Sequence, residues 1–227
     1  MNREDIIQAD GEFLVVYKPA GIAVQTARVG QMDVEHWLMG ELAENGRIPY
    51  LAVVHRLDQP VEGLLVFARN RHAAAGLSEQ MRNREMKKEY LAVVWGKPDR
   101  KQGRLSDFLK KDGKTNCSRV VPENCPGGKR AELEYECLQT AEDGRTLIRI
   151  RLLTGRHHQI RVQLAHAGIP IAGDRKYGGE RAGTGPLGLC ACALSFRHPR
   201  TGLRRQYRCV PRGEQFQAFD CAGFLKD

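Results

Sequence analysis

The residues best suited to chemistry form a short polar cluster, His55-Arg56-Leu57-Asp58, which is followed by Gln59-Pro60. Apolar runs flank the cluster: one ends in Val53-Val54, and the other covers residues 63–68. A polar turn between two buried strands is typical of a functional site on a rigid scaffold. Asp58 is therefore the first candidate for a catalytic residue, and the rest of the chain must supply its partners.

A second charged residue stands out in the segment 156–166, which is predicted to be a helix ending before Gly168-Ile169-Pro170. At 100° per residue, Arg161 falls next to Leu164 on the apolar side of this helix. A guanidinium that points inward is tolerated only with a carboxylate partner. The alternative is an arginine that extends along the surface to reach solvent.

A metal site is a further alternative, because His55 and Asp58 could act together with His157 and His158 in a metal-dependent hydrolase. These residues show no recognised ligand spacing such as H-E-x-x-H. Activity that survives a chelator would dismiss this alternative.

The composition is that of a globular protein. A chain of 227 residues is long enough for one sizeable domain or two small lobes, and 41% hydrophobic and 28% charged residues exclude a disordered chain. No apolar run approaches the roughly 18 residues that span a bilayer. The N-terminus lacks the apolar core of a signal peptide, so we expect a cytoplasmic location.

Basic residues are in excess, with 36 Lys and Arg against 27 Asp and Glu and a formal charge of +9. This excess favours a polyanionic partner, and nucleic acid before a membrane, because no basic amphipathic helix stands out. Charge alone leaves open whether the protein binds an anion at all.

The seven cysteines contain no C-x-x-C pair. Cys190-Ala-Cys192 is the one tight pair, and it lies in the apolar run 187–196. Buried, reduced thiols are the favoured interpretation, and a zinc site is the alternative.

The N-terminal part predicts a strand at 13–17, stopped by a Pro-Gly turn, and a helix at 33–44 with Asp33 as N-cap and Gly46 beyond its end. A second helix is expected at 71–84, capped by Asn70.

Further along, the apolar content predicts a strand at 87–95. The basic segment 100–129 is expected to be an extended loop or a loose hairpin, either a solvated surface loop or an arm that grips nucleic acid. Segments 131–138 and 146–153 alternate apolar with charged residues, which predicts an antiparallel hairpin whose Glu and Arg faces pair.

The tail predicts strands at 189–196 and 205–210 and a helix at 213–224. The simplest architecture is one continuous α+β domain with a mixed, largely antiparallel central sheet and flanking helices.

Four segments, in this order and with these separations, resemble the RluA family of RNA pseudouridine synthases. They are Leu14-Val15-Val16-Tyr17-Lys18-Pro19-Ala20-Gly21, His55-Arg56-Leu57-Asp58 with Gly63-Leu64-Leu65, Lys88-Glu89-Tyr90-Leu91-Ala92, and Gly155-Arg156-His157-His158-Gln159-Ile160-Arg161 with Gly173-Asp174-Arg175-Lys176-Tyr177-Gly178. The resemblance therefore spans nearly the whole chain.

The resemblance implies a pseudouridine synthase catalytic-domain fold and the isomerisation of specific uridines in structured RNA, rRNA or tRNA. The reaction breaks the N1–C1′ bond, turns the uracil and joins C5 to C1′, so it requires no cofactor or metal. Asp58 would act at the glycosidic centre, and Arg161 would pair with it and keep it ionised, since burial raises the pKa of a carboxyl. Tyr90 would cover the base and is a candidate proton acceptor; by pattern alone it is equally a core aromatic.

The target nucleotide would have to be flipped out of an RNA stem, which costs a few kcal/mol of unstacking. Arg56 resembles the family's arginine that fills the gap, and His55 would hold the loop in shape. Leu65 and Ile160 would supply apolar faces for the uracil. The residues expected to contact phosphate or to orient the neighbours of Asp58 are Arg156, His158 and Gln159.

The chain departs from the family's pattern at four places: Val61-Glu62 replaces Thr-Ser, His157 replaces Thr, Gln163 replaces His, and Cys190 stands where His is frequent. These departures bear on substrate choice more than on chemistry, and the charge of Glu62 near Asp58 has no evident role. In a further departure, we expect one catalytic domain, residues 1–227, without the separate N-terminal RNA-binding domain that many relatives carry. The resemblance implies a monomer with no obligate protein partner.

A rival from another class is an RNA-binding protein on the same fold with little or no catalysis. Equal RNA affinity without any carbodiimide-reactive uridine in the product would favour this rival. The presence of Asp58, Tyr90 and Arg161 together argues against it.

Overall fold

The computed structural model describes residues 1–28, 30–43 and 48–226. These residues form two compact units. Unit 1 comprises Met1–Lys88 and Ala191–Val210, and unit 2 comprises Glu89–Cys190 and Pro211–Asp227.

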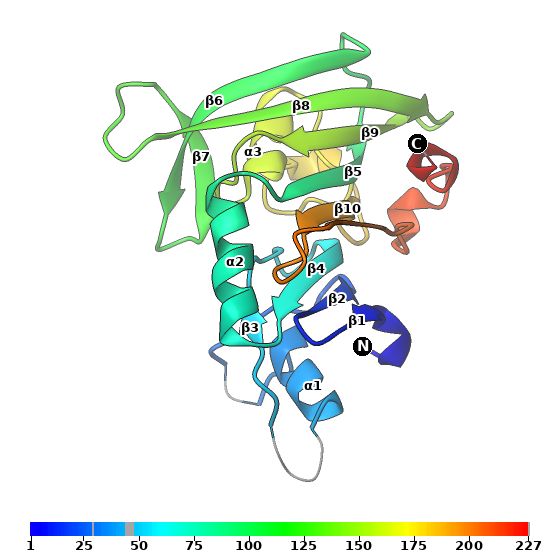
Figure 1. The fold of residues 1–227 in the computed structure, drawn as a ribbon. Helices are drawn as coiled ribbons and strands as arrows, with labels where there is room; N and C mark the ends of the chain where they lie inside the picture. Colours follow the sequence, from blue (N-terminus) through cyan, green and yellow to red (C-terminus); the bar gives the residue numbers. More distant parts are fainter. Residues whose placement is uncertain (29, 44–47, 227) are drawn as a thin grey trace. The chain divides into compact units, whose positions relative to one another are not determined.

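Unit 1 has strands in the order β1-β2-β4-β10, with β3 paired to β4 and β11 to β10 (Figure 1). The pairs β1–β2, β2–β4, β3–β4 and β10–β11 are antiparallel. Their bounds are Ile6–Ala9 (β1), Phe13–Lys18 (β2), Ala52–Val53 (β3), Glu62–Ala68 (β4), Leu189–Arg197 (β10) and Arg204–Arg208 (β11). The predicted strands at 13–17, 189–196 and 205–210 are confirmed. The apolar run before the Asp58 cluster forms only the two-residue strand β3, because the chain pairs with β4 no further than Val53.

Two helices of unit 1 begin where the sequence predicted. Asp33 caps α1 (Val34–Glu41) and accepts the His36 N–H at 2.8 Å, and Asn70 caps α2 (Arg71–Arg82) and accepts the Ala73 N–H at 2.8 Å. The predicted end of the first helix at Glu44 and Gly46 lies outside the described residues. A short 3₁₀ turn, η1 (Arg3–Asp5), precedes β1.

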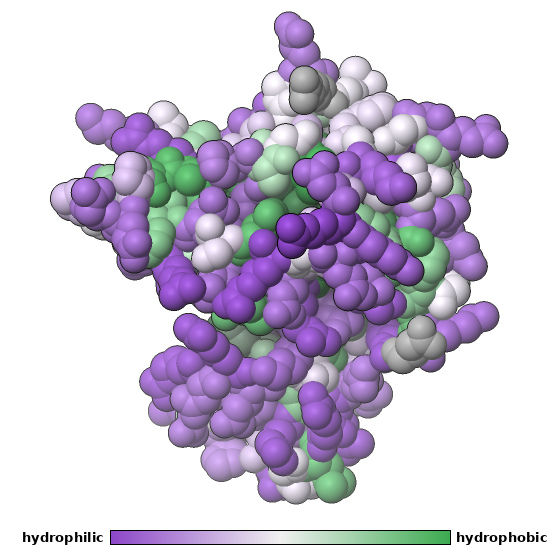
Figure 2. All heavy atoms as spheres, turned by 90° about the horizontal axis from the view of Figure 1, so that it is seen from above, coloured by the Kyte–Doolittle hydropathy of each residue, from purple (hydrophilic) through white to green (hydrophobic). Residues whose placement is uncertain are grey.

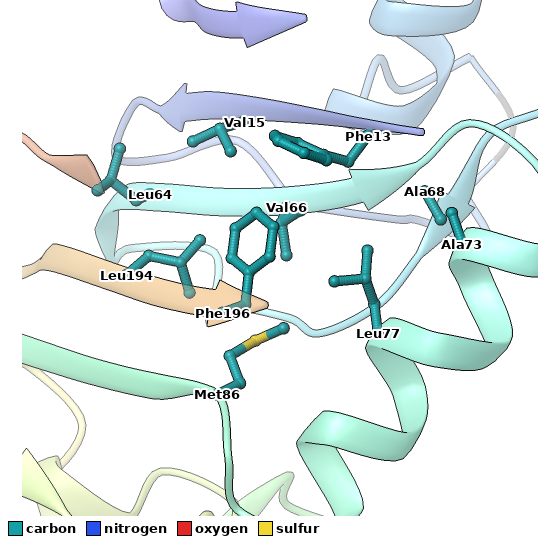
Figure 3. Packing of buried hydrophobic residues seen from close by; sticks show 10 residues of the cluster. All are labelled: Phe13, Val15, Leu64, Val66, Ala68, Ala73, Leu77, Met86, Leu194 and Phe196. Carbon is teal, nitrogen blue, oxygen red and sulfur yellow. The ribbon is translucent and has the colours of Figure 1, made fainter. Parts of the chain in front are cut away.

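The core of unit 1 gathers side chains from β2, β4, β10 and α2 around a common centre (Figure 3). The Phe13 and Phe196 rings meet edge to face, with centroids 5.0 Å apart. Gly63 allows the close approach of β4 to β10: it has φ +119°, and a Cβ there would lie 2.4 Å from the Ala191 carbonyl oxygen. This packing fixes the strand that follows the Asp58 cluster.

Unit 2 has antiparallel strands in the order β5-β9-β8-β6-β7 (Figure 1). Their bounds are Lys87–Trp95 (β5, which starts two residues before the unit), Gln102–Asp112 (β6), Cys117–Val121 (β7), Lys129–Thr140 (β8) and Arg145–Leu152 (β9). The predicted β8–β9 hairpin is confirmed, with Glu134 opposite Arg151 and Glu136 opposite Arg149. The Arg149 and Glu136 side chains are 3.4 Å apart.

The segment expected to be a loop or loose hairpin is a regular hairpin, β6–β7. The polar composition of this segment gave no sign of two regular strands. The strand β6 forms because it pairs with β8 along eight residues, from Gln102 to Leu109. Backbone pairing with a neighbour that is distant in sequence thus outweighs a weak local strand propensity.

Helix α3 (Gln159–His166) packs through Val162 on Leu109 of β6 and Ala131 of β8. It was predicted to begin at Arg156 and begins three residues later, because His158 has φ 53° and ψ 23°, a left-handed conformation that no α-helix continues through. The predicted burial on more than one side is confirmed, since the six residues from Gln159 to Leu164 are all buried.

The predicted helix at 213–224 is wrong. The chain forms two separate 3₁₀ turns there, η3 (Glu214–Phe216) and η4 (Gly223–Leu225), besides η2 (Gly179–Ala182) earlier in unit 2. Between η3 and η4 the Asp220 N–H bonds the Gln139 side chain of β8 at 3.2 Å, so this backbone donor is satisfied by a tertiary contact instead of a helical one.

The α+β class with a largely antiparallel sheet is confirmed. Within the described ranges, no three His, Cys, Asp or Glu side chains are grouped so as to hold a metal ion. Cys190 and Cys192 are buried, as predicted for structural thiols. Among the same residues there is no helix with the length and apolarity needed to cross a membrane.

Candidate active site

The Asp58 cluster lies on the connection between β3 and β4 in unit 1. The Asp58 carbonyl accepts the Val61 N–H at 3.0 Å and closes a turn. His55 and Leu57 are buried, Arg56 is exposed and Asp58 is half-buried. Alternate residues therefore anchor the connection, while Arg56 and part of Asp58 stay accessible to solvent.

His55 makes one contact that shapes this connection. Its Nε2 accepts the Val66 N–H of β4 at 3.4 Å. Burial, aided by the positive charge of Lys88, holds the pKa of His55 well below its usual value, so the ring is neutral and carries its proton on Nδ1. This bond ties the start of the cluster to the core strand that follows it.

A buried lysine holds the other end of the cluster. The Lys18 Nζ at the end of β2 donates to the carbonyls of Pro19 at 2.9 Å, Ile22 at 2.8 Å and Gln59 at 2.9 Å. Gln59 is also joined to Gly21 twice, because its carbonyl accepts the Gly21 N–H and its side chain donates to the Gly21 carbonyl, each at 2.9 Å. The turn after β2 and the turn after Asp58 are thus one hydrogen-bonded assembly.

Glu62, which the sequence left without a role, is buried beside this lysine. It accepts a hydrogen bond from the Tyr17 hydroxyl. Burial lowers the pKa of Lys18 to about 7, and the negative charges of Asp58 and Glu62 oppose that fall. Glu62 therefore helps to neutralise a buried cation, and its own charge is offset in return.

The proximity of Lys18 and Glu62 could have been predicted from the sequence. In the β2–β4 register Lys18 stands opposite Gly63, the residue after Glu62. Pairing the run 13–18 with the run 63–68 would have brought the two charges together.

In unit 2, Arg161 is buried and forms a two-point ion pair with Asp174. Its Nε donates to Oδ2 at 2.8 Å and its Nη2 donates to Oδ1 at 2.7 Å. The inward position and the need for a carboxylate partner are confirmed, and the alternative of a solvent-seeking arginine is wrong. The partner predicted from the resemblance, Asp58, belongs to unit 1, and that pairing stays a prediction.

Asp174 itself is held rigidly. Its Oδ1 also accepts the backbone N–H groups of Lys176 at 3.0 Å and Tyr177 at 3.2 Å. The side chain is 1% exposed, so its charge is balanced almost entirely by these donors and by Arg161. Asp174 lay in a segment of the family resemblance and was not recognised as the partner of Arg161.

Tyr177 extends this arrangement. Its ring lies 5.1 Å from the Arg161 guanidinium carbon, and its hydroxyl bonds His158 Nδ1 at 2.6 Å and accepts the Ser118 N–H of β7 at 2.9 Å. His157 stacks on His158 with centroids 3.7 Å apart and bonds the Ser118 hydroxyl at 2.9 Å.

The two histidines are neutral. Burial, with the charges of Lys111, Lys176 and Arg161, lowers the pKa of His157 to about 4. Burial and the neighbouring His157, Arg161 and Lys176 lower the pKa of His158 to about 3.

The remaining predicted residues are placed as follows. Tyr90 on β5 and Ile160 on α3 are each 5% exposed, and Leu65 on β4 is fully buried. Arg156 donates through Nε to the Arg130 carbonyl at 2.9 Å. Gln159 accepts from the Thr154 hydroxyl and the Arg156 N–H and donates to the Glu132 carbonyl, so its side chain joins the start of α3 to β8.

The candidate residues thus fall into two sets. Unit 1 holds His55, Arg56, Asp58 and Leu65, and unit 2 holds Tyr90, Arg156, His158, Gln159, Ile160 and Arg161. The partners that the sequence did not assign are Lys18 and Glu62 in unit 1 and Asp174, Tyr177 and Ser118 in unit 2.

Solved structures share the fold. The human RNA pseudouridylate synthase domain containing 4 matches with a TM-score of 0.75 at 24% identity, over 92% of this chain and 89% of the other. The human RNA pseudouridylate synthase domain containing 1 matches with a TM-score of 0.76 at 22% identity, over 91% and 83%.

Curated relatives match in sequence. An uncharacterised RNA pseudouridine synthase, YhcT of Bacillus subtilis (strain 168), is 34% identical over 87% of this chain and 65% of its own length. The ribosomal large subunit pseudouridine synthase C of Escherichia coli (strain K12) is 36% identical over 87% of this chain and 63% of its own. The chain therefore spans somewhat less than two thirds of the length of these relatives.

The family model described as RNA pseudouridylate synthase matches residues 12–166, a range that includes the Asp58 cluster, Tyr90 and Arg161. The resemblance drawn from four short segments is confirmed, and the chain belongs to the RNA pseudouridylate synthase family.

Proposed function

We propose that this protein is an RNA pseudouridine synthase that isomerises specific uridines in structured RNA, rRNA or tRNA. The observation that carries the proposal is the half-buried Asp58 on a turn clamped by a buried lysine, in a chain of this family. The name of the Escherichia coli relative makes large-subunit ribosomal RNA the first substrate to test.

In the proposed reaction Asp58 acts as the nucleophile or ion-stabilising carboxylate at C1′ while the N1–C1′ bond breaks. The freed uracil turns, C5 bonds C1′, and the C5 proton passes to an acceptor, for which Tyr90 is the candidate. Every atom of the substrate is kept, so the reaction needs no cofactor or second substrate.

Two cations would keep Asp58 ionised. The attraction between Lys18 and Asp58 is mutual, so a charged Lys18 favours the carboxylate form of Asp58 within unit 1. Arg161 is assigned the same task by the family resemblance. Its ion pair with Asp174 supports that assignment by holding the guanidinium in one orientation.

Arg56 is the side chain proposed to fill the gap left by a flipped nucleotide. It is exposed, two residues before Asp58, on a connection whose buried members are fixed. Unstacking costs a few kcal/mol, which contacts of this kind must offset.

The β6–β7 hairpin is the proposed contact for the RNA backbone. Lys110, Lys111 and Arg119 line a hollow of about 410 Å³ on it, together with Ser118 and the residues of its turn. The face of the molecule in Figure 2 is mostly hydrophilic, with apolar side chains in small areas between polar ones. Lysine and arginine contacts to phosphate make affinity fall steeply as salt concentration rises.

The test is conversion of uridine by purified protein, with rRNA and tRNA transcripts as substrates and carbodiimide mapping as the readout. Asp58→Asn should reduce conversion to background and keep the RNA affinity of the unaltered protein, because the substitution removes a charge and little volume. Asp143→Asn, at an exposed position in the β8–β9 turn, is the matched control and should convert uridine normally.

Conversion by Asp58→Asn at the unaltered rate would overturn the role of Asp58. RNA binding by the unaltered protein without any conversion would favour the rival, an RNA-binding protein that does not catalyse. A hydrolysed product in place of pseudouridine, lost on treatment with a chelator and restored by a metal ion, would favour the hydrolase alternative.

We also propose that the protein works in the cytoplasm as a monomer without an obligate protein partner, because the residues assigned to the reaction all belong to one chain. Sedimentation of the active protein with and without RNA tests the monomer. An active species that is found only as a dimer would contradict it.

A further inference from the structure

Tyr177 stands where three segments of unit 2 meet: strand β7, the start of helix α3, and the loop that carries Asp174. Its hydroxyl and its ring make separate sets of contacts. The hydroxyl joins β7 to α3, and the ring lies against Arg161.

The hydroxyl makes two hydrogen bonds. Its oxygen accepts the Ser118 N–H, and it is joined by a second hydrogen bond to Nδ1 of the neutral His158. The two bonds are 2.9 and 2.6 Å long. These bonds hold the phenol between strand β7 of the β6–β7 hairpin and His158, the residue that precedes α3.

The ring and backbone of Tyr177 hold the ion pair of Arg161. The guanidinium lies over the ring, and the Tyr177 N–H donates to the same Asp174 carboxylate that receives Arg161. A displacement of Tyr177 would therefore move both the carboxylate and the aromatic face that orient Arg161.

The hairpin is fastened to this loop at more than one place. Lys176 Nζ donates to the Asn116 carbonyl in the β6–β7 turn at 3.0 Å, and the Ser118 hydroxyl bonds His157. Ser118 itself stands opposite Lys111, one of the cations in the hollow. The hairpin that we assign to RNA backbone contact is thus connected by hydrogen bonds to the segment 174–177 and to the residues that precede α3.

His158 shows that these contacts impose a conformation on the backbone. A left-handed residue other than glycine persists only where its surroundings determine it, and the hydroxyl of Tyr177 and the ring of His157 supply those surroundings.

We infer that Tyr177 is a positioning residue that transmits the placement of the β6–β7 hairpin to Arg161, so that RNA held on the hairpin brings Arg161 into its working geometry. This inference rests on the proposed function. It predicts that the Tyr177 hydroxyl contributes to the rate of the chemical step and little to RNA affinity.

The test is Tyr177→Phe, which keeps the ring over Arg161 and the backbone bond to Asp174 and removes only the hydroxyl bonds. Under single-turnover conditions the maximal rate should fall about tenfold, as expected for one well-placed hydrogen bond, and the RNA Kd should change less than about twofold. Tyr207→Phe, a half-buried tyrosine on β11 in unit 1, is the matched control and should leave both values unchanged.

Hydrogen exchange on the protein without RNA gives a second readout. Loss of the hydroxyl should speed exchange at the Ser118 amide and also at the Tyr177 amide, because the hairpin and the loop move together. Faster exchange at Ser118 alone, an unchanged maximal rate, or a change confined to Kd would each overturn the inference.

Should Tyr177→Phe fail to fold, His158→Asn takes its place, because it removes the ring nitrogen that bonds the Tyr177 hydroxyl and asparagine tolerates the left-handed backbone at this position. The maximal rate should fall about threefold; an unchanged rate would overturn the inference. Absence of pseudouridine with the unaltered protein overturns the proposed function, whereas activity that is insensitive to these variants overturns only the role of Tyr177.

Discussion

In each unit a buried cation lies beside candidate active-site residues, and the two cations, Lys18 and Arg161, are accommodated differently. Lys18 in unit 1 donates to three backbone carbonyls, and the carboxylates of Asp58 and Glu62 act on it through charge. Arg161 in unit 2 grips one carboxylate, Asp174, at two points. The ammonium organises backbone turns, and the guanidinium organises side chains.

The difference follows from the shape of the two groups. An ammonium is a compact point charge whose three donors can be met by carbonyls from different segments, and it can release its proton when buried. A guanidinium is a planar fork that matches a carboxylate and keeps its proton in proteins. The Lys18 assembly should therefore respond to pH, and the Arg161 pair should respond only to loss of a partner.

The largest effect is expected from Asp174→Asn, which leaves Arg161 buried without its counter-charge. Removing one member of a buried ion pair typically costs about 3–5 kcal/mol, so the free energy of unfolding should fall by about that amount. Urea unfolding followed by circular dichroism measures it. Asp143→Asn, which alters an exposed ion pair, should change it by less than about 1 kcal/mol, and a comparable loss in both variants would contradict the special status of the buried pair.

A smaller loss is expected from Lys18→Met, which keeps the volume of the side chain and removes the ammonium. Three carbonyls lose a donor while the desolvation penalty of the cation disappears, so the free energy of unfolding should fall by about 2 kcal/mol. Adding Glu62→Gln should recover part of the loss. In Lys18→Met the buried carboxylate of Glu62 has lost the ammonium that offset its charge, and Glu62→Gln removes that uncompensated charge. A double variant that loses the full sum of the two single variants would show that the two charges do not interact.

The pH profile of stability separates the two cations most cleanly. The pKa of Lys18 is about 7 in the folded protein against 10.5 for an unperturbed lysine, so between these values the unfolded chain binds more protons. The contribution of Lys18 to the free energy of unfolding should then rise as pH increases from about 7 towards 10.5 and be least favourable below 7.

The measurement is the difference in urea stability between the unaltered protein and Lys18→Met across that range. The difference should vary with pH in this sense. If the difference in the free energy of unfolding is constant from pH 7 to 10, Lys18 does not titrate in this range. Lys18 and Arg161 would then both keep their charge across it.

Features set by neighbours along the chain were predictable. Asp33 and Asn70 cap the helices that follow them, because a side chain that accepts an N–H three residues ahead needs only local geometry. The alternation of Glu with apolar residues in β8 likewise predicted which face is buried. Both signals depend on spacing within one element.

Features that depend on tertiary partners were missed. Segment 213–224 has helical spacing but takes its hydrogen bonds in part from β8, and α3 starts late because Tyr177 and His157 hold His158 in a left-handed conformation. The segment 100–129 was predicted to be an extended loop or a loose hairpin, and its regular strand β6 depends on pairing with the distant strand β8.

By itself, the sequence determined the family, the polar turn around Asp58 and the inward face that carries Arg161, since residue order and helical spacing suffice for these. Only the tertiary structure decided that Asp174 receives Arg161, that Glu62 and Tyr17 lie beside Lys18, and that Tyr177 joins the basic hairpin to the ion pair. A charged group is recognisable from its own position, but the partner that balances it depends on strand register and on the path of loops that are far apart in the chain.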